Sequence, residues 1–307
     1  MKVSMILKII CVIGFIFDFI LVAVSVHKKR STEEGRKLFA EQKKFFVWNA
    51  MVGVVANFFD TLGVGSFATS SALFKIRGSI DDINVPGTLN VGDTFPVLAE
   101  AFLFFSLVDL DPLTLVSMLV AATLGSALGA NVVTKWNRTT VRYAMGIGLT
   151  ALGIIMACKV TGVGPFGETG TATALHGSKL IIGIVCNFVL GALMNVGVGL
   201  YAPCMALVAL LGMNVQAAFP IMMGSCAYLM SFGNTPVFVK QSRYDMVGVI
   251  TQGIFGCIGV FIAYTFVKNL PIKILTILVV VVVFFTAILF LRDGIKDTKA
   301  KKAGTAA

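Results

Sequence analysis

Long uninterrupted apolar runs constrain this chain more than any other feature. Residues 4–26, 113–134, 245–267 and 272–291 each form such a run. A helix needs about 20 mostly apolar residues to cross the hydrocarbon core of a bilayer, and each run is about that long. The apolar residues are continuous and do not alternate with polar ones, as they would in the strands of a membrane barrel. The sequence therefore predicts an all-α polytopic membrane protein.

The composition agrees with the lipid bilayer as the main environment of the chain. Of its 307 residues 57% are hydrophobic and only 13% are charged, whereas soluble domains carry about 25% charged residues. The net charge of +10 does not indicate a nucleic-acid partner, because Lys and Arg cluster in short loops and at the C-terminus. The six cysteines fall in apolar stretches without a C-x-x-C pair, so we expect no disulfide framework, no metal site and no cofactor.

The distribution of basic residues predicts the orientation in the membrane. Seven Lys and Arg lie in residues 27–44, directly after the first apolar run. Basic loops stay in the cytoplasm, so we expect the N-terminus outside the cell and residues 27–44 inside. The C-terminal tail, with five Lys and Arg after residue 291, also falls inside. The prediction is a multi-pass protein of the cell (inner) membrane with a cytoplasmic C-terminus.

Two halves of the chain match at one constant offset, the one that places Gly63 on Gly197, and the match needs no gap. The matched residues include glycines, a proline and an aspartate, which are less easily matched by chance than apolar residues. These matches are Gly63-Val64-Gly65 with Gly197-Val198-Gly199, Gly78 with Gly212, Pro86 with Pro220, Asp111 with Asp245 and Gly125 with Gly259. The sequence therefore predicts an internal duplication.

Each half contains five hydrophobic segments, and an odd number inverts the second half relative to the first. The predicted fold is thus two inverted five-segment repeats with broken re-entrant-type hairpins, plus one extra N-terminal transmembrane helix. The expected parts are the extra helix in 1–27, a cytoplasmic amphipathic linker in 28–44, the first repeat in 45–160, an extracytoplasmic linker in 161–177, the second repeat in 178–293 and a cytoplasmic tail in 294–307.

The Gly-Val-Gly breaks carry the functional prediction. Ser66–Arg77 has twelve residues, about 18 Å as a helix, and cannot cross a core of about 30 Å. We expect each half to enter the membrane, break at the glycines and restart, with N–H groups aimed at a midplane cavity. Broken helices at corresponding places in inverted repeats point to a transporter's substrate site. The alternative is that the glycines only allow close helix packing, and whether the hairpins are re-entrant or spanning is left open.

Polar and ionisable residues near the breaks are the candidate site residues. Ionisable groups inside a membrane are costly and point to function. We assign Asp60, Asp93 and Glu100 to ion coupling. The candidate substrate-binding residues are Asn57, Thr61, Gly63, Gly65, Ser66, Asn90, Asn195, Gly197, Gly199 and Tyr201.

The sequence around both breaks resembles the sulfite exporter TauE/SafE family of membrane permeases. The resemblance covers about residues 45–292, and Phe59–Gly65, Gly191–Gly199, Leu211-Gly212-Met213 and Pro220 carry it. The glycine run is thinner here than in the family; Pro203 comes early, and Thr69 holds the matching place in the first half. The resemblance implies transport of a small anion, such as sulfite, an organosulfonate or a related carboxylate.

The acids near the breaks have no Lys or Arg at the same predicted depth to pair with an anion. In one account backbone N–H groups and polar side chains hold the anion, and a carboxyl carries a coupling ion, H+ or Na+. In the other the carboxyls bind a cation, and the protein is a cation-binding carrier. A channel-like pore for a small ion or solute is a further alternative. No ATP-binding loop and no catalytic residue pattern is present, so we expect no enzyme; a homodimer is left open.

Overall fold

The computed structural model describes residues 3–63, 65–106, 109–163, 170–195, 199–266 and 272–302. Every regular element in these residues is a helix. The helices up to residue 161 are α1 (Val3–Ser31), α2 (Glu33–Lys43), α3 (Phe46–Thr61), α4 (Ser66–Arg77), α5 (Val85–Gly92), α6 (Thr94–Phe104), α7 (Pro112–Val133) and α8 (Arg138–Thr161). Those that follow are α9 (Gly177–Met194), α10 (Tyr201–Leu210), η2 (Val215–Ala217), α11 (Ala218–Tyr228), η3 (Leu229–Asn234, a π-helix), α12 (Thr235–Lys240), α13 (Met246–Phe266) and α14 (Ile272–Lys302).

Five of the described helices are long and apolar enough to cross a membrane. They are α1, α7, α9, most of α8 (Arg138–Cys158) and most of α13 (Met246–Thr265). The prediction of an all-helical chain is confirmed for the described residues, and these helices agree with a membrane protein. By contrast, α4 has twelve residues and α10 has ten, so neither reaches across about 30 Å of hydrocarbon.

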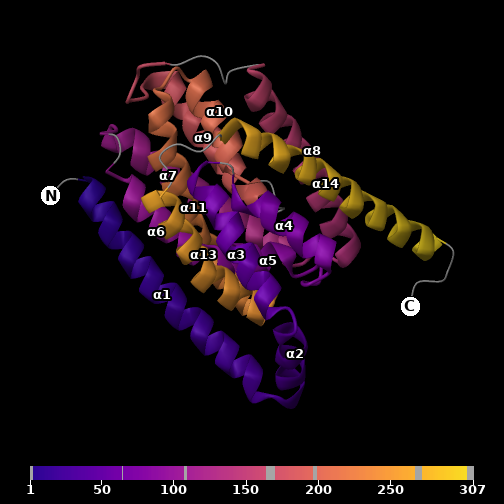
Figure 1. Cartoon of the computed structure of the whole chain (residues 1–307). Coiled ribbons are helices and arrows are strands. Elements are labelled where there is room, and N and C mark those ends of the chain that lie inside the picture. Colours follow the sequence, from indigo (N-terminus) through magenta and orange to yellow (C-terminus); the bar gives the residue numbers. More distant parts are fainter. Residues whose placement is uncertain are drawn as a thin grey trace.

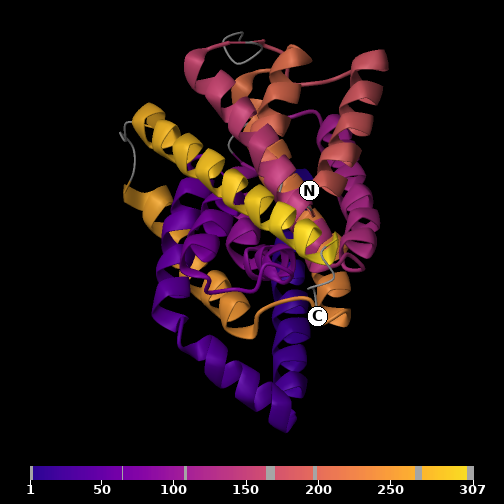
Figure 2. The same cartoon turned by 90° about the vertical axis from the view of Figure 1, so that its right-hand side faces the viewer.

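The long α1 lies along the outside of the bundle, and α8 and α14 lie together on the opposite side (Figure 1). A quarter turn brings α14 to the front and places α1 behind the bundle (Figure 2). The principal contacts of α1 within the body are with α6, and α2 folds back beside its end to reach α13. The remaining helices form the core between these two flanks.

Helices α7 and α13 begin in the same way at corresponding positions of the two predicted halves. Asp111 Oδ2 accepts a hydrogen bond from Thr114 N at 2.9 Å, and Asp245 Oδ1 accepts one from Gly248 N at 2.7 Å. Each aspartate therefore satisfies a backbone donor of the first turn that the helix itself leaves free. The bond from Thr114 also holds the pKa of Asp111 below its usual value.

Two helix pairs pack so closely that only glycine fits. Helix α7 lies against α9, and α13 lies against α3. A Cβ atom on Gly125 of α7 would lie 1.9 Å from Phe188 O, and one on Gly259 of α13 would lie 2.3 Å from Val54 O. Real Cβ atoms do not approach a carbonyl oxygen this closely, so both contacts depend on the missing side chain.

The third hydrophobic segment of each predicted half, residues 84–106 and 215–233, is not one continuous α-helix. The structure has α5 and α6 separated at Asp93, and it has α11, η3 and α12 running on to Lys240. A proline follows each irregularity, Pro96 in the first half and Pro236 in the second. The proline ring lacks an N–H and collides with the carbonyl four residues earlier, which explains why an α-helix does not continue there.

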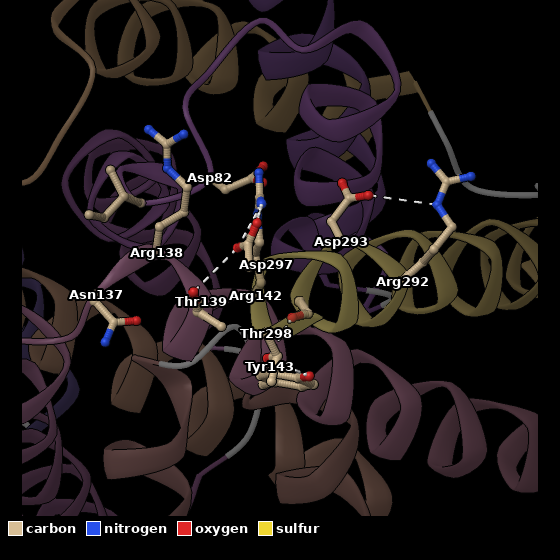
Figure 3. A network of polar contacts seen from close by, with 12 residues as sticks. Asp82, Asn137, Arg138, Thr139, Arg142, Tyr143, Arg292, Asp293, Asp297 and Thr298 are labelled. Atoms are coloured by element: carbon tan, nitrogen blue, oxygen red, sulfur yellow. Dashed lines mark hydrogen bonds and ion pairs between the residues drawn. The ribbon is translucent and has the colours of Figure 1, made fainter. Parts of the chain in front are cut away.

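A network of charges ties the beginning of α8 to the end of α14 (Figure 3). Arg142 lies 2.8 Å from Asp82 and 2.7 Å from Asp297. Lys75, near the end of α4, lies 2.6 Å from Asp82 and 2.8 Å from Asp293. Asp82, in the segment after α4, is therefore held between two basic groups. Ion pairs thus join α4, α8 and α14 at this end of the bundle.

The close contacts at the two glycines predict that one added methyl group lowers the stability of the fold. Gly125→Ala or Gly259→Ala should destabilise the protein by about 1–3 kcal/mol, because the added Cβ atom forces the helices apart. Thermal unfolding of the purified protein in detergent measures the effect. Leu128→Ala changes an outward-facing side chain of the same helix that is 62% exposed, and it should melt close to the original chain. Equal melting of Gly125→Ala and Leu128→Ala would contradict the role of the contact.

Candidate functional site

The first break follows α3 and restarts the chain as α4. Gly63 N donates to Asp60 O at 2.7 Å. Gly63 and Gly65 have φ values of +79° and +97°, a conformation that costs glycine little and other residues much more. The Asp60 side chain then accepts a hydrogen bond from Ser66 N, the first residue of α4, at 2.5 Å. Asp60 thus supplies the acceptor that the free start of α4 needs.

The second break lies against the first. The described chain resumes at Gly199, and α10 begins at Tyr201. Gly199 and Tyr201 line the same cavity as Gly65 and Ser66. Gly197 lies outside the described residues. The starts of α4 and α10, which are far apart in the sequence, therefore face a common space.

That space is small. It leaves about 20 Å³ for the centres of water-sized molecules, which is room for about one water molecule. Among the described residues, its only ionisable side chains are Asp60, Tyr201 and Cys226, and neither Lys nor Arg lines it. Its lining residues are Asp60, Gly65, Ser66, Phe67, Ala68, Val97, Leu152, Met194, Gly199, Leu200, Tyr201 and Cys226.

Glu100 of α6 joins the two breaks by hydrogen bonds. Its Oε1 lies 2.7 Å from Thr61 Oγ1, at the end of α3, and its Oε2 accepts a bond from the Tyr201 hydroxyl at 2.7 Å. Glu100 is fully buried and Tyr201 is 3% exposed. A carboxyl that meets two hydroxyls in this way fixes α3, α6 and α10 around the cavity.

A second buried carboxyl lies at the break between α5 and α6. Asp93 Oδ1 accepts a hydrogen bond from Asn57 Nδ2 at 3.3 Å, and the same amide lies 3.4 Å from Gln252 Oε1 on α13. The other oxygen of Asp93, Oδ2, is buried and has no partner among the described residues. Burying an unpaired polar atom is costly. Asp93 is therefore, like Glu100, a buried carboxyl that an ordinary apolar core would not contain.

A third buried group connects the two broken third segments. Asn234 Nδ2 lies 2.5 Å from Asn90 Oδ1, and Ser126 Oγ donates to Asn234 Oδ1. Asn195 Nδ2 donates to Ser126 O at 3.0 Å. These polar side chains hydrogen-bond mainly to one another, and none of them lines the cavity.

The structure thus divides the predicted site residues among different places. Those that line the cavity are Asp60, Gly65, Ser66, Gly199 and Tyr201. Glu100 does not line it but is hydrogen-bonded to Tyr201, and Thr61 is hydrogen-bonded to Glu100. Those that lie in the neighbouring polar groups are Asn57, Asp93, Asn90 and Asn195. Gly63 does not line the cavity, and a Cβ atom added to it would lie 3.6 Å from the side chains of Phe219 and Met222.

Sequence reasoning overlooked Gln252, Asn234 and Ser126. The offset that places Gly63 on Gly197 also places Glu100 on Asn234, so the predicted repeat itself contained a signal for this asparagine. The sequence contains no such signal for Gln252 and Ser126. Their hydrogen-bond partners lie on other helices and come close only because α13 packs against α3 and α7 against α9.

Comparison with protein-family models, with curated proteins and with solved structures gave no match.

The bond between Tyr201 and Glu100 predicts a measurable loss of stability. Tyr201→Phe removes a donor and leaves Glu100 Oε2 buried without it, which should cost about 1–3 kcal/mol. Thermal unfolding in detergent is the measurement. Tyr264→Phe is the matched control, because this tyrosine is 51% exposed and its hydroxyl has no hydrogen-bond partner in the described part of the chain. If both variants melt alike, the bond does not hold the cavity wall.

Proposed function

We propose that the protein is a secondary transporter of a small anion such as sulfite, an organosulfonate or a related carboxylate, and that it works by alternating access around the cavity between the two breaks. The observation that carries this proposal is that the helices α4 and α10 both start at one cavity. Helix starts present N–H groups and partial positive charge, which favour an anion. Helix starts that meet at one cavity between two breaks are the arrangement expected of a transporter's substrate site.

An inverted repeat of the TauE/SafE type is the architecture that we infer. Helices α7 and α13 begin at positions related by the same offset that places Gly63 on Gly197. The carbonyls that meet Gly125 and Gly259 belong to Phe188 and Val54, and this pair is related by that offset too. Each of these features supports two equivalent halves.

The direction of α8 and α14 supports the inversion. Arg142, near the start of α8, contacts Asp297 near the end of α14. Further along α8, a Cβ on Gly153 would lie 3.0 Å from the ring of Phe284, which comes earlier in α14. The two helices therefore run antiparallel, although they hold the same place in the two halves. Equivalent helices of opposite direction are what an inverted repeat requires.

An acid beside an anion site needs an explanation, and the hydrogen bond of Asp60 provides one. Its carboxylate already accepts the N–H of Ser66, which is the donor that an incoming anion would use. Protonation of Asp60 would free this donor and remove the negative charge that repels the anion. Substrate and H+ would then bind together, and H+ is the coupling ion that we propose in preference to Na+.

The contacts of Glu100 favour a proton in the same region. The Thr61 hydroxyl has one hydrogen but lies 2.9 Å from Asn57 O and 2.7 Å from Glu100 Oε1. Both contacts are satisfied when Thr61 donates to Asn57 O and a protonated Glu100 donates to Thr61. This arrangement places a proton on Glu100, close to Asp60.

A cation-binding carrier is the second candidate, favoured by the Asp60 carboxyl and by a cavity lining whose described residues include no Lys or Arg. It predicts stabilisation by a monovalent cation alone, whereas the anion transporter requires the anion. A channel-like pore would instead give large unitary currents and no counterflow.

A ligand screen tests the substrate class. Sulfite, thiosulfate, small sulfonates and dicarboxylates are added to the purified protein, and its thermal unfolding is recorded. A substrate at 100 times its dissociation constant adds about 2.7 kcal/mol of stability. Gly199→Leu should abolish this shift, and Val24→Leu on the exposed side of α1 should retain it. An anion that shifts both variants equally binds elsewhere, and the assigned site would be wrong.

A transport assay tests the coupling role of Asp60. In proteoliposomes, a gradient of one pH unit should drive roughly tenfold accumulation of a small sulfonate per coupled proton, since one unit is worth about 1.4 kcal/mol. Asp60→Asn cannot bind the proton, so accumulation should fall to the level without a gradient. The control is Glu41→Gln on the surface of α2. If Asp60→Asn still accumulates substrate with the gradient, Asp60 does not couple.

A further inference from the structure

An apolar groove runs between α1 and the body of the bundle. Its larger part has a volume of about 530 Å³ and lies between α1, α6 and α13. A second part of about 470 Å³ continues it toward the start of α1, and both parts share Phe15 and Cys257. Phe19 of α1 and Ile254 of α13, which border the groove, are 61% and 58% exposed. The groove is therefore open to the surroundings of the protein along its length.

One end of this groove is positively charged. His27 and Arg30, near the end of α1, line it, and no carboxylate of the described residues lines either part. Neither side chain forms an ion pair with a described residue. The Arg30 guanidinium lies over the ring of Phe39 of α2, 4.2 Å from its centroid. The aromatic ring holds this cation in place and leaves its hydrogen-bond donors free.

The dimensions of the groove match a lipid. From Phe15 to Arg30 the helix rises about 22 Å, which exceeds half of the hydrocarbon thickness of about 30 Å. An apolar trough of this length accommodates an acyl chain of one leaflet. The basic end then lies where the headgroup layer begins, and Arg is suited to phosphate because its planar fork binds two oxygens.

We propose that this groove binds an anionic phospholipid. One acyl chain lies along α1 against Phe15, Phe19 and Ile254, and the phosphate contacts Arg30 and His27. The charge of the groove end selects an anionic headgroup over a zwitterionic one. This site is separate from the transport site and does not depend on its proposed function.

The groove lies directly behind the candidate site. Phe95 of α6, two residues beyond Asp93, and Gly253 of α13, next to Gln252, both line it. A Cβ on Gly253 would lie 2.8 Å from the ring of Phe95, so α6 and α13 touch at this point. A lipid in the groove therefore presses on the two helices that hold Asp93 and Gln252, and it fixes the otherwise peripheral α1 to them.

Lipid binding to the delipidated full-length protein tests the proposal. Native mass spectrometry compares dioleoylphosphatidylglycerol with dioleoylphosphatidylcholine at equal concentration. The anionic lipid should bind at least about fivefold more, and the double variant His27→Gln/Arg30→Gln should remove this preference. The control Lys296→Gln changes a basic side chain of α14, which lies on the opposite side of the bundle from α1 (Figure 1), and should retain the preference. Equal binding of both lipids, or an unchanged preference in the double variant, would overturn the proposal.

A second pair of variants separates the groove from simple attraction to charge. Ala23 lines the groove, whereas Val24 faces the other side of α1. Ala23→Trp fills the groove without changing its charge and should reduce binding of the anionic lipid several-fold, whereas Val24→Trp should not. If Ala23→Trp binds as well as the original chain, or if glycerol 3-phosphate competes with the lipid at equal concentration, the acyl chain is not held in the groove and the proposal is wrong.

Discussion

The fold depends on one constraint, that a backbone interrupted among apolar helices must still satisfy its N–H and C=O groups. At the first break the aspartate three residues before the glycines turns back and accepts the N–H that begins α4. Two glycines with positive φ make this turn. The carboxyl group is thus a structural acceptor and, at the same time, the only carboxyl of the described residues that lines the cavity. Asp60 therefore stabilises the break and also supplies the carboxyl group of the cavity.

Buried polar side chains around this break are arranged in linked groups. Glu100 binds hydroxyls from α3 and α10, while Asn57 lies between Asp93 and Gln252. Such networks are stabilising when every member has a partner and costly when one lacks it. Asp93 Oδ2 and Asn57 Oδ1 are buried without a hydrogen-bond partner in the described structure. The network therefore has open positions, and one of them lies at the break between α5 and α6.

Much of this architecture was predictable from the sequence because apolar length and backbone chemistry are local properties. The long apolar runs predicted the helices α1, α7 and α13 within a few residues, and the glycine pairs predicted where α4 and α10 begin. The breaks within the third segments were not predicted, because a hydrophobic run hides the effect of Pro96 and Pro236. The neighbours of Asp60 were predictable only where they are close in sequence. The contacts of Gln252 and Ser126 depend on which helices pack together, and no local pattern encodes that choice.

The charge network at the end of the α8–α14 pair has a consequence for how the protein responds to dissolved salt. Arg142, Asp297 and Lys75 lie at one end of this pair, whereas glycine and apolar contacts such as Gly153 with Phe284 hold its middle. Salt screens exposed charges strongly but screens partly buried ion pairs much less. The side chains of these pairs are only 9% to 26% exposed, so this end of the helix pair should stay joined over a wide range of ionic strength.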